Sequence, residues 1–172
     1  MNQFKLCMCL LVCSIIFSCK DDDEPDTTAA FVGTYKIDEI EFKVSQGNDS
    51  EEADIDVNWE IEFSKAQGLK NDELEADVQE VADELFAQFL VLLENSYNTK
   101  VDFLEDPIAE VTGDEIEIDA DVNLVISDAG GSESYETDFE LLGELDGNEI
   151  EVHINMFFLD FKIEVEAVAE KQ

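Results

Sequence analysis

The sequence predicts a mainly β domain (β+α), an antiparallel meander of six to eight strands that forms a barrel or a sandwich, with one long amphipathic helix inserted after the second strand. Three observations support this fold class. Apolar and acidic residues alternate with a period of two over much of the chain, turn residues separate the alternating stretches, and one segment has helical spacing instead. These patterns extend over roughly 140 residues, which is the size of a single domain.

The first expected element is the stretch Phe31–Tyr35, and the second strand centres on Trp59. Around Trp59, apolar residues on one face alternate with acidic residues on the other. Such alternation is typical of an antiparallel strand with one buried and one solvated face. Later segments repeat the pattern. The apolar series, at every second position, are Ile55–Phe63, Ile116–Ile126, Tyr135–Leu141 and Ile150–Phe158.

The helix is expected over about 72–95, with Asp72 and Glu75 as a capping box at its start. Its second half, FAQFLVLL, is apolar almost all round. Two interpretations stay open: the helix covers or plugs the open face of the sheet, or it forms a lid or wall over a ligand pocket. The apolar positions with helical spacing are Leu74, Val78, Val81, Leu85, Phe89 and Leu92.

The last apolar series lies on odd-numbered positions, from Phe157 to Ala167, whereas the series before it lies on even ones. Because a shift of one residue moves every side chain to the other face, we expect a bulge or tight bend near Phe158–Asp160. Other turns are indicated by Gly, Asn and Asp, and the last of them is predicted to be a hairpin. They lie at Gln46–Asn48, Gly113–Asp114, Gly130–Gly131 and Asp146–Asn148.

The first 18 residues have the order of a secretory signal peptide: Lys5, an apolar run over Leu6–Phe17, and then Ser18. The run is too short for a transmembrane helix, which needs about 20 apolar residues. Ile16–Cys19 resembles a bacterial lipobox, and this resemblance implies that Cys19 is lipidated and becomes the first residue of the mature chain. The alternative is an ordinary signal peptide followed by an incidental cysteine.

The other cysteines, Cys7, Cys9 and Cys13, lie inside the leader. Cys19 is therefore expected to be the only thiol of the mature chain, so the domain has no disulfide of the kind that many exported proteins contain. A lone cysteine at this position is consistent with acylation. Stable anchoring in a membrane needs more than one acyl chain.

Lys20, Asp21, Asp22 and Asp23 follow the lipidated position. They resemble the signal with which Bacteroidota export lipoproteins to the outside face of the outer membrane. The resemblance implies a lipid-anchored outer-membrane protein at the cell surface of a Gram-negative bacterium. The alternative is an acidic tether that keeps the domain off the membrane. The expected organisation is a signal peptide over 1–18, a tether over 19–28 and one domain over 29–172.

The chain has 45 acidic residues against nine lysines and no arginine, and its formal net charge at pH 7 is −36. Nucleic acid is therefore excluded as an expected partner, because binding to phosphates requires Lys and Arg. A field of this sign attracts cations and basic protein surfaces. Repulsion between the acids also predicts that the fold depends on screening by salt.

No catalytic site is predicted. His153 is the one histidine, and alternation places it on the acidic face without a nucleophile beside it, so we expect neither enzymatic activity nor a cofactor. Two Asp-x-Asp-x-Asn triplets resemble the start of a calcium loop but lack its later Gly and Glu. They predict non-specific association with Ca²⁺ rather than a specific site. The carboxylates concerned are those of Asp54, Asp56, Asp119 and Asp121.

Phe31–Ile37 resembles the first strand of lipocalin-like domains in many Bacteroidota lipoproteins, where Gly-x-Trp opens the barrel. Here Tyr35 stands in place of Trp, and the family's packing Arg is absent. The resemblance implies a cavity for a small apolar ligand. The alternative is a filled core, in a module that binds cations or basic protein partners through its acidic face. The residues expected to line a cavity are Trp59, Phe63, Phe139, Met156, Phe158 and Phe161.

Overall fold

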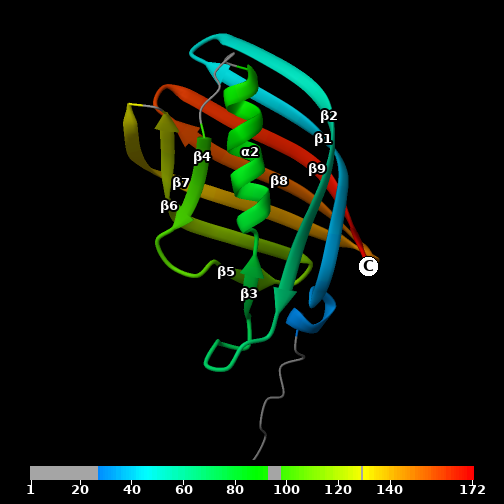
Figure 1. Ribbon diagram of the computed structural model, residues 1–172. Helices are drawn as coiled ribbons and strands as arrows, with labels where there is room; N and C mark the ends of the chain where they lie inside the picture. Colours follow the sequence, from blue (N-terminus) through cyan, green and yellow to red (C-terminus); the bar gives the residue numbers. More distant parts are fainter. Residues whose placement is uncertain (1–26, 93–97, 129) are drawn as a thin grey trace, which may run out of the picture.

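The computed structural model describes residues 27–92, 98–128 and 130–172 (Figure 1). The predicted signal peptide, Cys19 and the export signal Lys20–Asp23 lie outside the described residues. The elements, in chain order, are the 3-10 helix η1 (Thr27–Ala30), β1 (Gly33–Gln46), β2 (Asp49–Ser64), β3 (Glu73–Asp77), α2 (Gln79–Leu92), β4 (Asn98–Phe103), β5 (Ile108–Thr112), β6 (Glu115–Asp128), β7 (Gly131–Asp146), β8 (Glu149–Phe158) and β9 (Phe161–Lys171).

Eight strands form a closed antiparallel barrel in meander order. In the series β1, β2, β3, β5, β6, β7, β8, β9, each strand pairs with the next, and β9 pairs back with β1. β4 is a ninth strand outside this ring. It pairs with Val122–Ser127 of β6, on the edge of β6 that β5 occupies over Glu115–Ile118. The predicted meander barrel is confirmed.

Strands close the barrel fully at one end only. β3 pairs with β2 only at Glu62–Ser64, and β5 pairs with β6 only at Glu115–Ile118. Beyond these short pairings, β4 continues the wall from β6, and α2 lies between β4 and β2 (Figure 1). We call this interval between β4 and β2 the seam. In the seam, a helix takes the place of sheet as the barrel wall.

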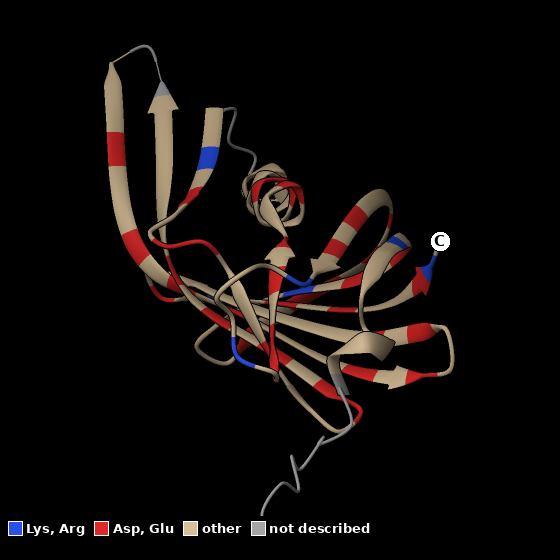
Figure 2. Ribbon diagram, turned by 90° about the horizontal axis from the view of Figure 1, so that it is seen from below, with Lys and Arg blue, Asp and Glu red and all other residues tan. Residues whose placement is uncertain are grey.

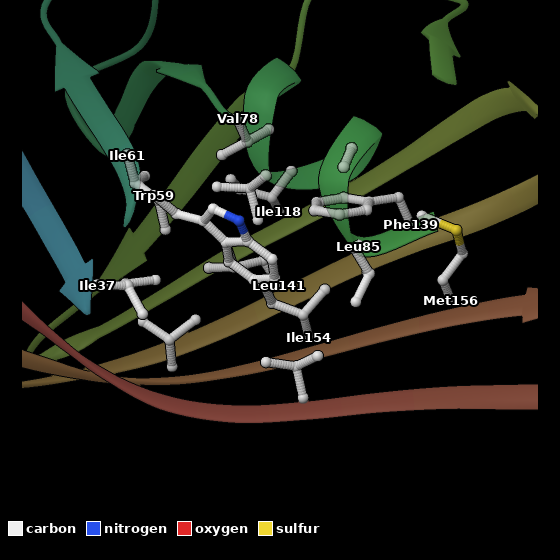
Figure 3. Packing of buried hydrophobic residues seen from close by; sticks show 14 of the residues in the cluster. Ile37, Trp59, Ile61, Val78, Leu85, Ile118, Phe139, Leu141, Ile154 and Met156 are labelled. Carbon is white, nitrogen blue, oxygen red and sulfur yellow. The ribbon is translucent and has the colours of Figure 1, made fainter. Parts of the chain in front are cut away.

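The inner face of α2 fills the barrel. Its buried residues are Val81, Ala82, Leu85, Phe86, Phe89 and Leu90. They pack against inward-facing side chains of the strands, and Figure 3 shows Leu85 among Trp59, Phe139 and Met156. Full burial of a large apolar side chain contributes about 1.5–3 kcal/mol. This agrees with the first of the two interpretations of the helical segment, in which the helix covers or plugs the open face of the sheet.

Two sets of hydrogen bonds fix the helix in the seam. On the side of β4, the backbone N–H of Val101 donates to Asp83 Oδ1 (2.6 Å), and Gln79 Nε2 donates to the Val101 carbonyl oxygen (2.6 Å). On the side of β2, the buried indole N–H of Trp59 donates to Glu84 Oε2 (2.5 Å). The helix is thus bound to both strands that border the seam.

The predicted start of the helix was wrong. Leu74, Ala76 and Val78 are buried at alternate positions, and residues 73–77 form β3. The helix therefore follows a third strand, and the predicted capping box of Asp72 and Glu75 does not exist, because Glu75 lies in β3. The prediction failed because Leu74 and Val78, four residues apart, fit both a helix face and an alternating strand. The predicted end at 95 lies outside the described residues.

The alternating strands and the turns between them are confirmed. Gly47 and Gly147 have φ of 62° and 69° in the two-residue turns of the hairpins β1–β2 and β7–β8. The change of phase occurs at the turn Leu159–Asp160, where Leu159 has a φ of 54°. Phe157 and Leu159 were wrongly included in the inner series, because both side chains are exposed and the odd series begins at Phe161.

The N- and C-terminal ends of the domain contact each other through the side chain of Lys171. Thr28 is fully buried, so the domain begins within the segment that was predicted to be tether. Tyr35 is buried, and Lys171 Nζ lies 5.4 Å from the centre of its ring and donates to the Ala30 carbonyl oxygen. Burial raises the pKa of the Tyr35 hydroxyl. Lys171 therefore supplies the cation that packs on the first-strand aromatic ring in a chain without arginine.

The barrel interior is narrow where β6, β7 and β8 lie side by side. Gly143 is buried, and a Cβ atom at this position would lie 2.7 Å from Ile150 Cγ2 and 2.8 Å from Ile116 Cγ2. Real carbon atoms do not approach so closely, so the side chains on both neighbouring strands already occupy the space. Only glycine fits here.

The bond between Trp59 and Glu84 gives a test of how the helix is held. Glu84→Ala leaves a buried indole N–H without its acceptor, and we expect it to lower the free energy of unfolding by about 1–3 kcal/mol. Glu84→Gln keeps an oxygen acceptor and is expected to cost less than half as much. Urea denaturation followed by Trp59 fluorescence measures both. Equal losses in the two variants would contradict this role.

Candidate functional site

The six residues predicted to line a ligand cavity lie in the core. Trp59, Phe63, Phe139 and Met156 are almost completely buried, Phe158 is 8% exposed and Phe161 is half-buried. Phe158 lies at the centre of an aromatic cluster with two rings of the helix, at centroid distances of 5.3 Å to Phe86 and 5.8 Å to Phe89. Phe161 lies 5.4 Å from Phe89. Side chains of α2 occupy the space that the predicted ligand would need, which favours the filled-core interpretation.

One concave surface of the described structure lies at the end of the barrel, and others lie on its outside. The surface at the end is an open groove of about 720 Å³ between the β1–β2 hairpin and the end of α2, and Phe161 is the one predicted pocket residue that lines it. Two open clefts flank the loop Leu104–Pro107, between β4 and β5. The first, about 490 Å³, is bordered by β2, β3, the start of α2 and the loop. The second, about 660 Å³, is bordered by the loop, β5 and β6. Neither cleft is lined by any of the six predicted residues.

Both clefts are lined by acids, and no basic residue lines either of them. Glu105 and Asp106 of the loop belong to both. A hydrogen bond from Lys70 lowers the pKa of Glu73 and raises that of Lys70 at the rim of the second cleft. The remaining acids are Glu62, Glu75, Asp77 and Asp102 in the first cleft, and Glu73, Glu110, Glu117, Asp119 and Asp121 in the second.

On the outer face of the barrel, acids stand directly opposite acids on neighbouring strands (Figure 2). Glu117 of β6 is paired with Glu110 of β5, which is paired with Glu73 of β3. Between β6 and β7, the pairs are Asp119 with Glu140 and Asp121 with Asp138. Like charges directly opposite each other destabilise a sheet. We call this surface the acidic face.

The few lysines neutralise only part of the acidic face. Lys43 lies between strands, 3.6 Å from Glu52 and 3.9 Å from Glu164. The pairs of Lys36 with Asp38, Lys100 with Asp102 and Lys162 with Glu164 each lie within one strand. Exposed pairs of this kind contribute at most about 1 kcal/mol. The strongly negative outer field therefore persists.

The residues of the calcium prediction lie on this face in two separate places. Asp54 and Asp56 of β2 are opposite Glu41 and Glu39 of β1, whereas Asp119 and Asp121 belong to β6. Within residues 27–92, 98–128 and 130–172, no group of three or more His, Cys, Asp or Glu side chains is placed to hold a metal ion. Non-specific association with Ca²⁺ stays a prediction.

His153 lies on the outer face of β8, with its side chain 53% exposed. Its Nδ1 is 3.7 Å from Glu166 Oε1 of β9. The expectation that the chain has no enzymatic activity stays a prediction.

The sequence did not single out the loop Leu104–Pro107 and the two clefts beside it. Asp106-Pro107 is typical of a turn, and Glu105 and Asp106 are the two acids of the loop. In a chain with 45 acidic residues, such a signal does not distinguish one loop from another. None of the helices in the described part of the chain is long and apolar enough to cross a membrane.

Comparisons with known proteins find little similarity. No protein-family model matches this chain, and no curated protein matches it. Among solved structures, a proposed outer membrane protein of Bacteroides fragilis is similar to 86% of this chain, with 15% sequence identity and a TM-score of 0.43. This chain covers 53% of that protein, or about half its length.

The acidic face gives a test of electrostatic strain. Asp121→Lys places a cation directly opposite Asp138, and we expect it to raise the free energy of unfolding by about 0.5–1 kcal/mol in low salt. Glu136→Lys is the control, because it changes the net charge equally but lies opposite the neutral Asn123. The advantage of Asp121→Lys over this control is expected to disappear in about 1 M NaCl. Thermal unfolding at both salt concentrations measures it, and equal effects of the two variants would contradict local repulsion.

Proposed function

We propose that this chain is a non-enzymatic, lipid-anchored protein of the outer membrane that binds basic protein partners through its acidic face at the cell surface. The observation that carries the proposal is the position of α2. Because Leu85, Phe86 and Phe89 occupy the barrel interior, the surface left for recognition is the outer one, where the acids and both clefts lie.

The lipid anchor is supported by the N-terminal sequence. Ser18-Cys19 follows an apolar run of signal-peptide length, and Lys20–Asp23 follows the cysteine. Acyl chains on Cys19 would attach the domain to a membrane without a transmembrane segment. The acidic residues after Cys19 would separate a negatively charged domain from the lipid surface.

A basic protein surface fits the acidic face better than a single metal ion does. The acids form rows across adjacent strands, such as Glu117, Glu110 and Glu73, and not a cluster of converging ligands. A partner with several Lys or Arg residues can face many of these carboxylates at once. Complementary charge of this kind accelerates association and makes it sensitive to salt.

A second candidate function is the binding of a small apolar ligand in a lipocalin-like barrel. It is favoured by the meander order of the eight barrel strands and by the packing of Lys171 on Tyr35 in the Gly33-Thr34-Tyr35 strand. In this case α2 must move out of the seam to admit the ligand. The filled interior makes this candidate the weaker one.

Native mass spectrometry tests the proposal on the full chain, produced in a Bacteroidota host. We expect a mature protein that begins at Cys19 and carries acyl chains, bound to a basic polypeptide that dissociates above about 0.5 M NaCl. The Cys19→Ser variant is expected to lose the acyl mass and to keep the partner, because the acidic face is unchanged.

Two results would overturn the proposal. One is a small apolar molecule that stays with the protein, in the absence of a polypeptide partner, since it would favour the lipocalin-like candidate. The other is an unmodified Cys19 in a protein that fractionates away from the outer membrane.

A further inference from the structure

β2 has one fully paired edge and one largely unpaired edge. Its residues 49–56 and 59–63 pair with β1, with a register shift between the two stretches, but only Glu62–Ser64 pair with β3 on the other side. Among the described strands, none lies beside Asp49–Ile61 on that second edge, because the seam begins there. We call Asp49–Asp56 on this side the open edge. A strand edge of this kind presents backbone donors and acceptors to any extended segment that approaches it.

The other border of the seam is β4, where α2 forms hydrogen bonds with the backbone. On β4, the N–H and carbonyl groups of Val101 are both bonded to side chains of α2, through Asp83 and Gln79. On β2, the bond to the helix is made by the indole of Trp59 and not by the backbone. The helix thus satisfies both backbone groups of Val101 on β4, whereas among the described residues no hydrogen bond joins it to the backbone of the open edge.

The hairpin geometry identifies which backbone groups point outward. Gln46 and Asp49 flank a two-residue turn, and a pair in this position exchanges hydrogen bonds. Bonded and non-bonded pairs alternate along an antiparallel ladder. The backbone N–H and carbonyl groups of Ser50, Glu52 and Asp54 therefore point away from β1, into the seam.

Free space adjoins one end of this edge. An open groove of about 720 Å³ lies between the β1–β2 hairpin and the end of α2, and it reaches the open edge at residues 49–51. Val44, Leu92 and Phe161 give it an apolar wall, and residues 49–51 form its rim. Farther along the open edge, the inward-facing residues Ala53 and Ile55 are apolar and half-buried, so an added strand would place every second side chain beside them and the others on the outer face.

The charges on the outer face define the segment that fits. The exposed side chains of β2 next to the open edge are Glu52, Asp54 and Asp56. Opposite charges on neighbouring strands stabilise a sheet, and like charges destabilise it. A second copy of this edge would place acids against acids, so the pattern disfavours self-pairing and favours a segment with a cation at every second position.

We propose that the open edge accepts an extended segment of a partner protein as an additional strand, with Lys or Arg at alternate positions and apolar residues between them. This mode of recognition combines backbone hydrogen bonds, which give affinity, with alternate side chains, which give specificity. The inference rests on the proposed function and deepens it, since it names the place on the acidic protein where the basic partner docks.

A synthetic twelve-residue peptide with lysine and valine in alternation tests the inference on the full-length chain. We expect the peptide to slow amide hydrogen exchange at Ser50, Glu52 and Asp54 by about tenfold or more. A peptide of the same sequence with methylated backbone nitrogens keeps the charge but cannot form the ladder, and we expect no such protection from it.

Two matched triple variants separate the edge from the general field. Glu52→Gln, Asp54→Asn and Asp56→Asn together are expected to weaken peptide binding by about tenfold, because three opposite-charge pairs are lost. Glu140→Gln and Glu144→Gln of β7 with Glu151→Gln of β8 remove the same charge at positions that are paired on both edges, and are expected to weaken binding by less than about threefold.

The outcomes distinguish this inference from the proposed function. Salt-sensitive binding that protects none of the three amides, or that both triple variants weaken equally, would overturn the strand-addition site and leave the acidic face as the binding surface. No binding of the lysine peptide in low salt would overturn both.

Discussion

Two strands of five residues, β3 and β5, stand next to strands of 16 and 14 residues in this barrel, and they cannot cover the edges of those longer strands. The architecture depends on this mismatch. The sheet closes where β3 and β5 lie, and it stays open beyond them, so backbone groups and apolar side chains would face water there. The helix α2 covers the apolar side chains and bonds to the backbone of Val101 on β4, while none of the described strands pairs with the open edge of β2. Its apolar face fills the barrel, while Gln79, Asp83 and Glu84 bond to the strands on either side of the seam.

In the function proposed above, this solution places the binding surface on the outside of the barrel. A barrel of eight strands has an interior wide enough for side chains or for one small ligand, and here Leu85, Phe86 and Phe89 take that space. The outer face keeps acids in register with acids, which costs stability. A chain that carries such repulsion over several strands gains from a partner that neutralises it. Strength of binding and strain within the free protein are then two consequences of the same charge pattern, and both decrease as salt screens it.

Local periodicity predicted much of the fold, and long-range pairing explains what it missed. Ile118, Val122 and Ile154 were assigned to the inner face because alternation is a property of neighbouring residues. β3 was read as helix because Leu74 and Val78 fit both periods, and only the pairing with β2 decides between them. The six predicted pocket residues were correctly placed inside the barrel, but their neighbours in α2 depend on how the whole sheet closes. The open edge of β2 could not be predicted from the sequence either, because it depends on which strand pairs beside β2 in the folded chain.

The central claim is that α2 is a permanent part of the barrel wall and core, and not a lid. Native-state hydrogen exchange of its backbone amides tests this most directly. If the claim holds, the amides of Leu85–Leu90 exchange only through global unfolding, with the same free energy of opening as those of Ile154 and Val165 in the centre of the sheet. Exchange of the helix amides through a partial opening, at a free energy several kcal/mol below that of the sheet, would contradict the claim. The barrel interior would then again be a candidate ligand-binding site.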